Sequence, residues 1–183
     1  DQAALLDVHV ERWVPERIFE RLLEGADAAD STRKLSFQAL QRAAPLVPAL
    51  VGGSADLAES NLTDIKGGGS FSPETPEGRN VHYGIREHAM GAMANGLAYD
   101  GLFLPFTSTF LQFADYMRPA VRLAAMAGLQ VIDVWTHDSI FLGEDGPTHQ
   151  PVEHLTALRA IPNLHVVRPC DGEEVAVGWA HAL

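Results

Sequence analysis

The feature that most constrains the fold is an alternation of short apolar stretches with segments of helical apolar spacing. The apolar stretches predict strands at residues 49–51, 81–83, 102–106, 130–136 and 164–167. The helical spacing predicts helices at residues 85–99, 109–126, 152–159 and from 172 onward. Near-continuous apolar strands that alternate with helices are typical of a parallel sheet. The sequence therefore predicts an α/β fold, with a parallel sheet flanked by helices on both faces.

Two helices are expected before the first strand. Pro15 to Leu23 has apolar residues at helical spacing, and Ser31 can cap a second helix that ends before Pro45. The chain has 183 residues, of which 46% are hydrophobic, and this fits one domain. We expect residues 1–30 to be a lead and residues 31–183 to be the α/β core, truncated at its C-terminal end.

Charge and hydropathy exclude some classes of protein. The formal charge of -11, from 13 basic and 24 acidic residues, argues against a nucleic-acid-binding surface. The sequence has no apolar stretch long enough to cross a bilayer and no secretory signal pattern at Asp1, so a cytoplasmic protein is expected. The lone Cys170 is predicted to be a small buried residue.

Polar side chains follow several of the predicted strands. Ser54 and Asp56 follow the first, residues 107–109 follow the third, and the loop from Thr136 to Gln150 follows the fourth. Glu87 opens the helix after the second strand. Ligands of parallel sheets bind at the carboxyl ends of the strands, so we expect these groups to converge there.

The loop from Thr136 to Gln150 holds two histidines and three carboxylates. Taken by themselves, His137, Asp145 and His149 could bind a metal, bind a polyol or stabilise the loop. Their spacing matches no compact zinc motif, which makes metal the weakest of the three. Asp138 and Asp145 could simply close turns.

Other candidates also have two interpretations. Glu87 can complement a helix dipole, or it can serve as a buried carboxyl that shares a proton with a ligand, because desolvation disfavours the charged form. Phe110, Phe113 and Tyr116, spaced by three, can pack in the core or stack on a flat heterocycle. Arg33 can be solvated or can bind phosphate.

Together these segments resemble transketolase, in its middle domain. The resemblance spans nearly the whole chain, and its motifs are residues 32–34, 52–57, 83–90, 109–111, 136–140, 143–151 and 168–169. The longest are Gly-Ile-Arg-Glu-His-Ala-Met from Gly84 and Gly-Glu-Asp-Gly-Pro-Thr-His from Gly143. Phe141 stands where relatives usually have glycine.

The resemblance implies that this domain binds the pyrimidine half of thiamine diphosphate. Glu87 would hydrogen-bond the pyrimidine ring nitrogen and promote the imino tautomer. Phe113 would stack on the pyrimidine, with Phe110 and Tyr116 beside it. Asp56 would lie near the cofactor at a dimer interface.

The resemblance also implies the substrate site. Arg33, Ser60 and His137 would bind the phosphate of a sugar phosphate, and Asp145 would read a sugar hydroxyl. His149 would lie near both the cofactor and the reacting carbonyl, and Glu87 and His149 would be the catalytic residues. The reaction implied is transfer of a two-carbon ketol unit from a ketose phosphate to an aldose phosphate, as in the pentose phosphate pathway.

The resemblance places Mg²⁺ and the diphosphate in an N-terminal domain absent from this chain, contributed by the partner subunit of a homodimer. We therefore expect the chain to be a fragment that is inactive alone, and to hold no metal itself. Two alternatives remain: a related thiamine-diphosphate synthase that condenses pyruvate with glyceraldehyde phosphate, and a noncatalytic dimerisation module.

Overall fold

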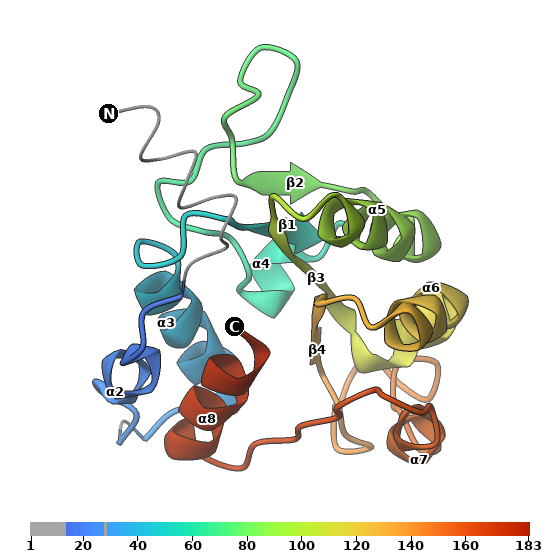
Figure 1. Ribbon diagram of the computed structural model, residues 1–183. Helices are drawn as coiled ribbons and strands as arrows, with labels where there is room; N and C mark the ends of the chain where they lie inside the picture. The colour runs from blue at the N-terminus through green and yellow to red at the C-terminus, as the bar shows by residue number, and fades with distance from the viewer. Residues whose placement is uncertain (1–13, 28) are drawn as a thin grey trace, which may run out of the picture.

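A four-stranded parallel sheet forms the centre of the molecule, in a computed structural model that describes residues 14–27 and 29–183 (Figure 1). The strand order is β2-β1-β3-β4. The strands are β1 (Leu50–Ser54), β2 (Asn80–His82), β3 (Leu104–Phe110) and β4 (Ile132–Thr136). All three pairings are parallel, which confirms the predicted sheet type.

The centre of the sheet is tightly packed. β1 and β3 are buried along their whole length, as expected for strands covered on both faces. A Cβ on Gly52 would meet the carbonyl oxygen of Phe106 at 2.0 Å, and one on Gly53 would meet that of Val81 at 1.9 Å. These two glycines therefore allow β1 to lie between its neighbours.

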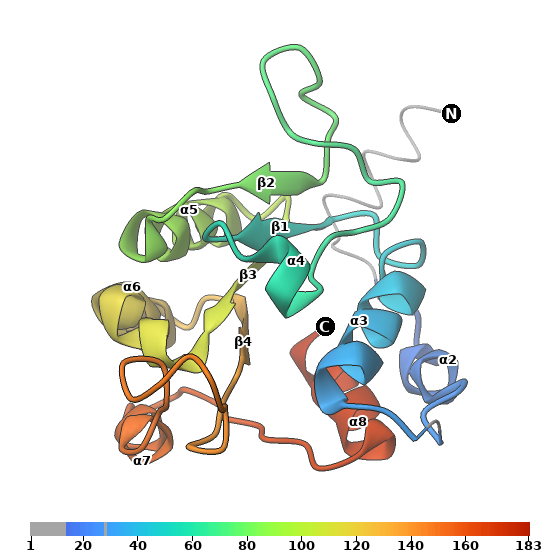
Figure 2. The ribbon, with the colours of Figure 1, turned by 180° about the vertical axis from the view of Figure 1, so that it is seen from behind.

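Helices cover both faces of the sheet, as the sequence predicts (Figures 1 and 2). The elements are α2 (Ile18–Leu23), α3 (Thr32–Ala43), α4 (Ala58–Asn61), α5 (Glu87–Asp100), the short 3₁₀ helix η1 (Leu111–Phe113), α6 (Ala114–Ala127), α7 (His154–Arg159) and α8 (Gly172–Ala182). One core joins α2, α3 and α8 to the sheet around Leu50 and Phe106. A second core joins α5 and α6 to the other face around Met90 and Met117.

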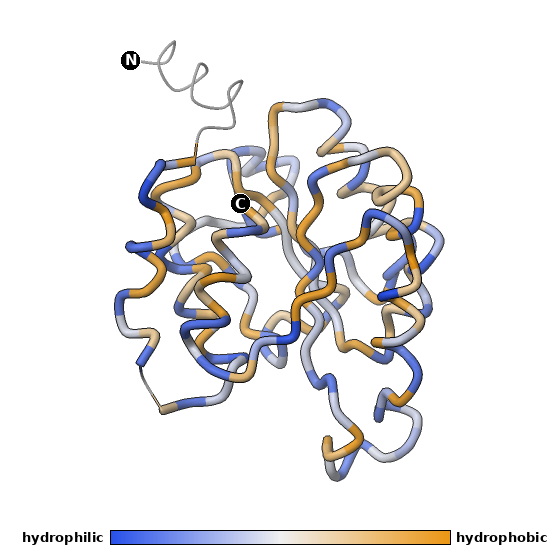
Figure 3. Tube along the Cα trace, turned by 60° about the horizontal axis from the view of Figure 1, so that its bottom comes forward, coloured by the Kyte–Doolittle hydropathy of each residue, from blue (hydrophilic) through white to orange (hydrophobic). Residues whose placement is uncertain are grey.

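Hydropathy follows this layering. Orange and white stretches run through the middle of the molecule, and blue, hydrophilic positions recur on its outer turns (Figure 3). None of the helices within residues 14–27 and 29–183 combines the length and the apolar character that crossing a membrane requires.

The predicted strand at 164–167 is wrong: this segment has no regular secondary structure. Its apolar side chains Leu164 and Val166 pack against a cluster that contains Leu111 and Leu158. Its polar side chain His165 stacks on His181 of α8, with ring centroids 5.0 Å apart. The alternation of apolar and polar residues therefore reflects side-chain contacts in two directions. It does not reflect backbone hydrogen bonds to β4.

Three further predictions need correction. The helix expected from Thr109 begins later, because β3 continues through Phe110 before η1 and α6. Ser31 is the N-cap residue of α3, but its side chain makes no capping hydrogen bond. Cys170 is exposed rather than buried, because it lies in the polar turn that leads into α8.

Candidate functional site

The carboxyl ends of the four parallel strands lie at one edge of the sheet, where the sequence analysis expects polar side chains to converge. Phe110 pairs with Thr136 at the ends of β3 and β4, and Ser54 pairs with Ser108 and His82. Asp56 and His137 follow directly, both in the left-handed region, with φ of 62° and 53°. Two non-glycine residues in this conformation at one edge indicate a constrained site.

Five aromatic rings gather at this edge, and we call them the aromatic cluster: Phe110, Phe113, Tyr116, His137 and His149. Phe110 stacks on His137 with centroids 3.8 Å apart and on Phe113 at 5.7 Å. Phe113 in turn stacks on Tyr116 at 5.9 Å and meets His149 edge-on at 5.1 Å. The rings come from β3, η1, α6 and the loop after β4, so Phe110, Phe113 and Tyr116 do not share the single helix predicted at residues 109–126.

Glu87 is the first residue of α5 and is buried, with 8% of its surface exposed. Within residues 14–27 and 29–183, no hydrogen bond or ion pair engages its carboxylate, and no ring contact or hydrogen bond joins it to the aromatic cluster. Neither Glu87 carboxylate oxygen is among the fully buried side-chain atoms of the described residues that lack a hydrogen-bond partner, so the carboxylate end of this residue stays open to solvent or to a ligand.

Charges surround His137. Burial lowers the pKa of His137, and the Arg33 guanidinium lowers it further, while the carboxylates of Asp145 and Asp138 act in the opposite direction. Because the net shift is downward, the ring is neutral at neutral pH.

The other predicted site residues each have their own surroundings. Arg33 is half-buried and donates from Nη1 to the backbone oxygen of Ser60 at 2.6 Å. Asp145 and Asp56 are exposed. Across the described part of the chain, no hydrogen bond or ion pair joins Asp56 to the aromatic cluster. His149 is held at Nδ1 by Thr148 Oγ1 at 2.8 Å.

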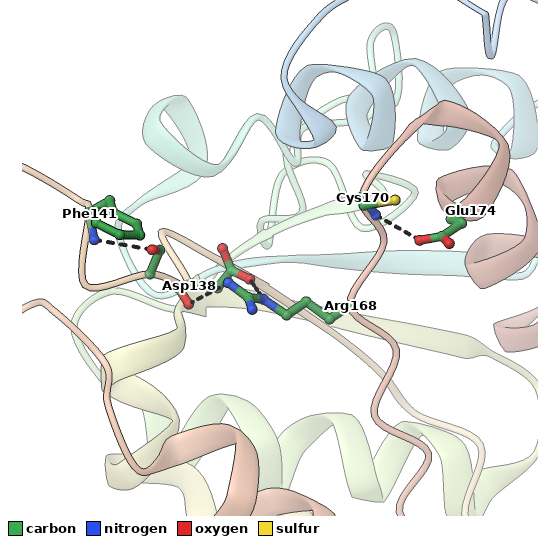
Figure 4. Close-up of polar contacts among 6 residues, drawn as sticks. Asp138, Phe141, Arg168, Cys170 and Glu174 are labelled. Atoms are coloured by element: carbon green, nitrogen blue, oxygen red, sulfur yellow. Dashed lines mark hydrogen bonds and ion pairs between the residues drawn. The ribbon is translucent and has the colours of Figure 1, made fainter.

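An ion pair that the sequence analysis missed fixes the loop after β4 (Figure 4). Arg168 Nε donates to Asp138 Oδ2 at 2.6 Å, and Phe141 N donates to Ser139 Oγ at 3.1 Å. Phe141 is otherwise exposed, at 88%. The loop is thereby tied to the segment that enters α8.

Buried polar side chains lie beneath His137, and the sequence analysis missed these too. Thr136 Oγ1 donates to Asn61 Oδ1 at 2.6 Å and lies 2.7 Å from His137 Nδ1. Asn61 Nδ2 donates to Ser54 Oγ at 3.3 Å. The only sequence signal is that Thr136 precedes His137, since Asn61 lies far away along the chain.

A cleft of 780 Å³ runs along the free edge of β4. His137 and Arg33 line one end of it, but Glu87, Phe113 and His149 do not. Residues 164–167 form part of its wall, so the cleft is mainly the space between β4 and the segment that fails to pair with it.

Two groups in the described residues have geometry that could hold a metal ion: Asp115 with Glu153 and His154, and Cys170 with Asp171 and Glu174. His137, Asp145 and His149 form no such group in that part of the chain. The geometry therefore does not favour the metal interpretation of the loop.

Comparison with known proteins gives consistent matches. Residues 29–183 match the family model described as transketolase, pyrimidine binding domain. The transketolase of Aquifex aeolicus is 60% identical over 152 residues, which cover 83% of this chain and 22% of the relative. The transketolase of Physarum polycephalum is 51% identical over 181 residues, 99% of this chain and 27% of the relative.

A crystal structure of transketolase from Pichia stipitis in complex with sedoheptulose-7-phosphate is also similar. It superposes with a TM-score of 0.92 at 46% identity, covering 99% of this chain and 28% of that one. This chain thus spans about a quarter of the length of the relatives that it matches.

Proposed function

This chain belongs to the transketolase family through its pyrimidine-binding domain, and from that premise we propose that it supplies half of a thiamine diphosphate site. The complete enzyme would transfer a two-carbon ketol unit from a ketose phosphate to an aldose phosphate. When bound, thiamine diphosphate supplies stabilisation of the carbanion that such a transfer requires. The protein's part is to bind, orient and move protons.

The residues present fit an aminopyrimidine ring. Phe113 and Tyr116 offer flat apolar faces beside the buried ring of Phe110, and such faces suit a planar heterocycle. Glu87 offers a carboxylate that has no hydrogen-bond or ion-pair partner in the described protein and stays open to a ligand. This unpartnered carboxyl is the observation that carries the proposal, because a ring nitrogen of the ligand would satisfy it.

Glu87 would share a proton with that ring nitrogen. In a site from which water is excluded, a carboxyl can hold or release a proton according to small changes in its partner. His149 lies in the aromatic cluster, 5.1 Å from Phe113 between ring centroids. It would face both the cofactor and the reacting end of the substrate.

The sugar phosphate would bind beside the aromatic cluster. Arg33 keeps further N–H groups beyond the one given to Ser60, and guanidinium groups bind phosphate with paired donors. Ser60, His137 and Asp145 would complete the contacts, with the exposed Asp145 carboxylate accepting from a sugar hydroxyl. Asp56 would lie near the cofactor.

The rest of the site would come from elsewhere. We propose that a diphosphate-binding domain of the partner subunit in a homodimer holds the diphosphate and Mg²⁺. We also propose the cytoplasm as the location and the pentose phosphate pathway as the context.

Substitution of Glu87 tests the proposal. In the assembled enzyme, Glu87→Gln should lower ketol transfer between sugar phosphates by at least about a hundredfold, the usual effect of losing a positioned proton-transfer group. Circular dichroism should show an unchanged fold. Glu173→Gln, which alters an exposed first-turn glutamate of α8, is the matched control and should keep full activity.

Near-normal turnover of the Glu87 variant would refute its role. Offering pyruvate in place of the ketose phosphate separates the related synthase, since only that enzyme would use pyruvate as donor. Wild-type enzyme that is inactive with both donors would favour the dimerisation module.

A further inference from the structure

A continuous chain of hydrogen bonds runs from His137 down into the sheet. Its members are His137 Nδ1, Thr136 Oγ1, the Asn61 side-chain amide, Ser54 Oγ and the backbone oxygen of Ser108. Thr136, Asn61 and Ser54 are 8%, 1% and 4% exposed, so water does not compete for these contacts. We call this chain the buried relay.

The direction of the relay is fixed at its inner end. The backbone oxygen of Ser108 can only accept, so the Ser54 hydroxyl donates its single proton there, at 3.0 Å. Ser54 Oγ then accepts from Leu57 N at 3.1 Å and from Asn61 Nδ2 at 3.3 Å. The amide of Asn61 therefore points its nitrogen at Ser54 and its oxygen at Thr136.

The same argument determines which nitrogen of the His137 ring carries the proton. Asn61 Oδ1 accepts the Thr136 hydroxyl proton at 2.6 Å. Thr136 Oγ1 has no second proton, so its contact with His137 Nδ1 at 2.7 Å requires the proton to lie on Nδ1. In a neutral ring, Nε2 then carries a lone pair.

The opposite orientation of Asn61 makes fewer hydrogen bonds. It would reverse every bond from Ser54 to His137 and would leave Ser54 Oγ and Ser108 O facing each other at 3.0 Å without a proton between them. Each net hydrogen bond favours the state that makes it by roughly two- to tenfold. The forward orientation, which makes all four bonds, is the favoured one.

We propose that Asn61 and Thr136 are positioning residues that hold the proton of His137 on Nδ1, so that Nε2 is the ring nitrogen left to contact the ligand. The ligand contact rests on the proposed function. Within the described residues, no hydrogen bond engages Nε2, which leaves it available.

The surroundings keep the ring neutral. The groups that act on its charge are Arg33 on α3 and Asp138, Asp145 and His149 in its own loop. Burial and Arg33 lower the pKa of His137. At neutral pH the His137 ring therefore carries a single proton, and that proton lies on Nδ1.

Nitrogen NMR of the ring tests the proposal directly. In a ¹⁵N-histidine-labelled chain at neutral pH, His137, assigned by loss of its signals in His137→Gln, should show a protonated Nδ1 and an unprotonated Nε2. Thr136→Val removes the acceptor of the Nδ1 proton with little change of shape, so the two signals should move toward each other as the tautomers mix.

Thr109→Val is the matched control. It removes a fully buried hydroxyl from the neighbouring strand β3, and that hydroxyl has no hydrogen-bond partner. The His137 signals should stay in place in this variant.

A wild-type proton on Nε2 would overturn the proposal, and so would an unchanged spectrum in Thr136→Val. If that variant unfolds, the wild-type spectrum alone decides the outcome. The measurement needs no turnover, so an intact Nδ1–H tautomer together with an assembled enzyme that shows no ketol transfer would refute the proposed function and leave the tautomer assignment standing.

Discussion

Asp133 places a titratable carboxyl in the middle of β4. Burial raises the pKa of Asp133 to about 6, and the Thr107 hydroxyl, which donates to Oδ1 at 2.5 Å, offsets only part of that effect. Because the folded-state pKa lies above the ordinary 3.8, protonation favours the folded state. This contribution is complete below the ordinary value and is lost as the pH rises through about 6.

Asp133→Asn keeps an oxygen that accepts from Thr107 and removes the charge. Relative to wild type, its free energy of unfolding should rise by on the order of 1–3 kcal/mol between about pH 4 and pH 7. Urea denaturation of both proteins at the two pH values measures this difference. A difference that stays constant with pH would contradict the raised pKa.

The grouping of side chains at the candidate site was predictable where those side chains are close in sequence. The loop that holds His137 and His149 was recognised from its composition, and both rings do lie in the aromatic cluster. Asn61 was not predicted, because its partner Thr136 comes 75 positions later and only the fold brings them together. Cys170 was misjudged because hydrophobicity alone does not report the polar turn around it.

Two glycines in α5 have opposite surroundings. A Cβ on Gly91 would lie 2.9 Å from the Cβ of Ala120 and 3.3 Å from Met117 Cε, where α5 packs on α6. A Cβ on Gly96 would meet nothing within 4 Å. Gly91 therefore allows the close approach of the two helices, whereas Gly96 only adds backbone freedom.

Alanine at each position separates these effects. Gly91→Ala should lower the free energy of unfolding by roughly 1–3 kcal/mol through overpacking. Gly96→Ala should raise it by roughly 0.5–1 kcal/mol, because alanine restricts the unfolded chain and favours helix. Thermal and urea denaturation measure both, and stabilisation by Gly91→Ala would contradict the close contact.

Helices and strands whose own sequence carries the apolar pattern were predicted correctly. Those whose limits depend on pairing with a segment distant in the sequence were not. The buried strands were recognisable from continuous apolar runs, although β3 extends four residues beyond its expected end at Phe106, through Thr and Ser side chains that its neighbours bury. Residues 164–167 show the limit. Their alternation suits a strand, but a strand also needs backbone hydrogen bonds to a neighbour, and residues 164–167 do not pair with the free edge of β4.

At the scale of the whole molecule, the position of the site followed from topology. A parallel sheet brings the ends of all its strands to one edge, so Asp56, Glu87 and His137 could be assigned to that edge without any distance. Which of them touch could not be predicted. The rings of Phe110 and His137 stack, while Glu87 makes no ring contact or hydrogen bond with the aromatic cluster in the described residues.

The outer surface of α5 and α6 exposes several large apolar side chains. The two helices pack on each other on one face of the sheet (Figure 1). Their exposed large apolar side chains are Met93, Tyr99, Tyr116, Leu123 and Met126, which are 49% to 78% exposed. Large exposed apolar side chains on neighbouring helices suit an interface, and a second copy of this domain is the occupant that the proposed homodimer supplies.

Charge placed on this surface tests the interface. Met93→Glu and Met126→Glu keep good helix formers but would bury an unpaired carboxylate between subunits, so each should raise the dimer dissociation constant at least about tenfold. Val177→Glu, at a 51% exposed position of α8, is the matched control and should leave dissociation unchanged. Sedimentation equilibrium measures all three. A wild-type chain that stays monomeric at high concentration, or equal effects of the three substitutions, would rule out self-association through α5 and α6.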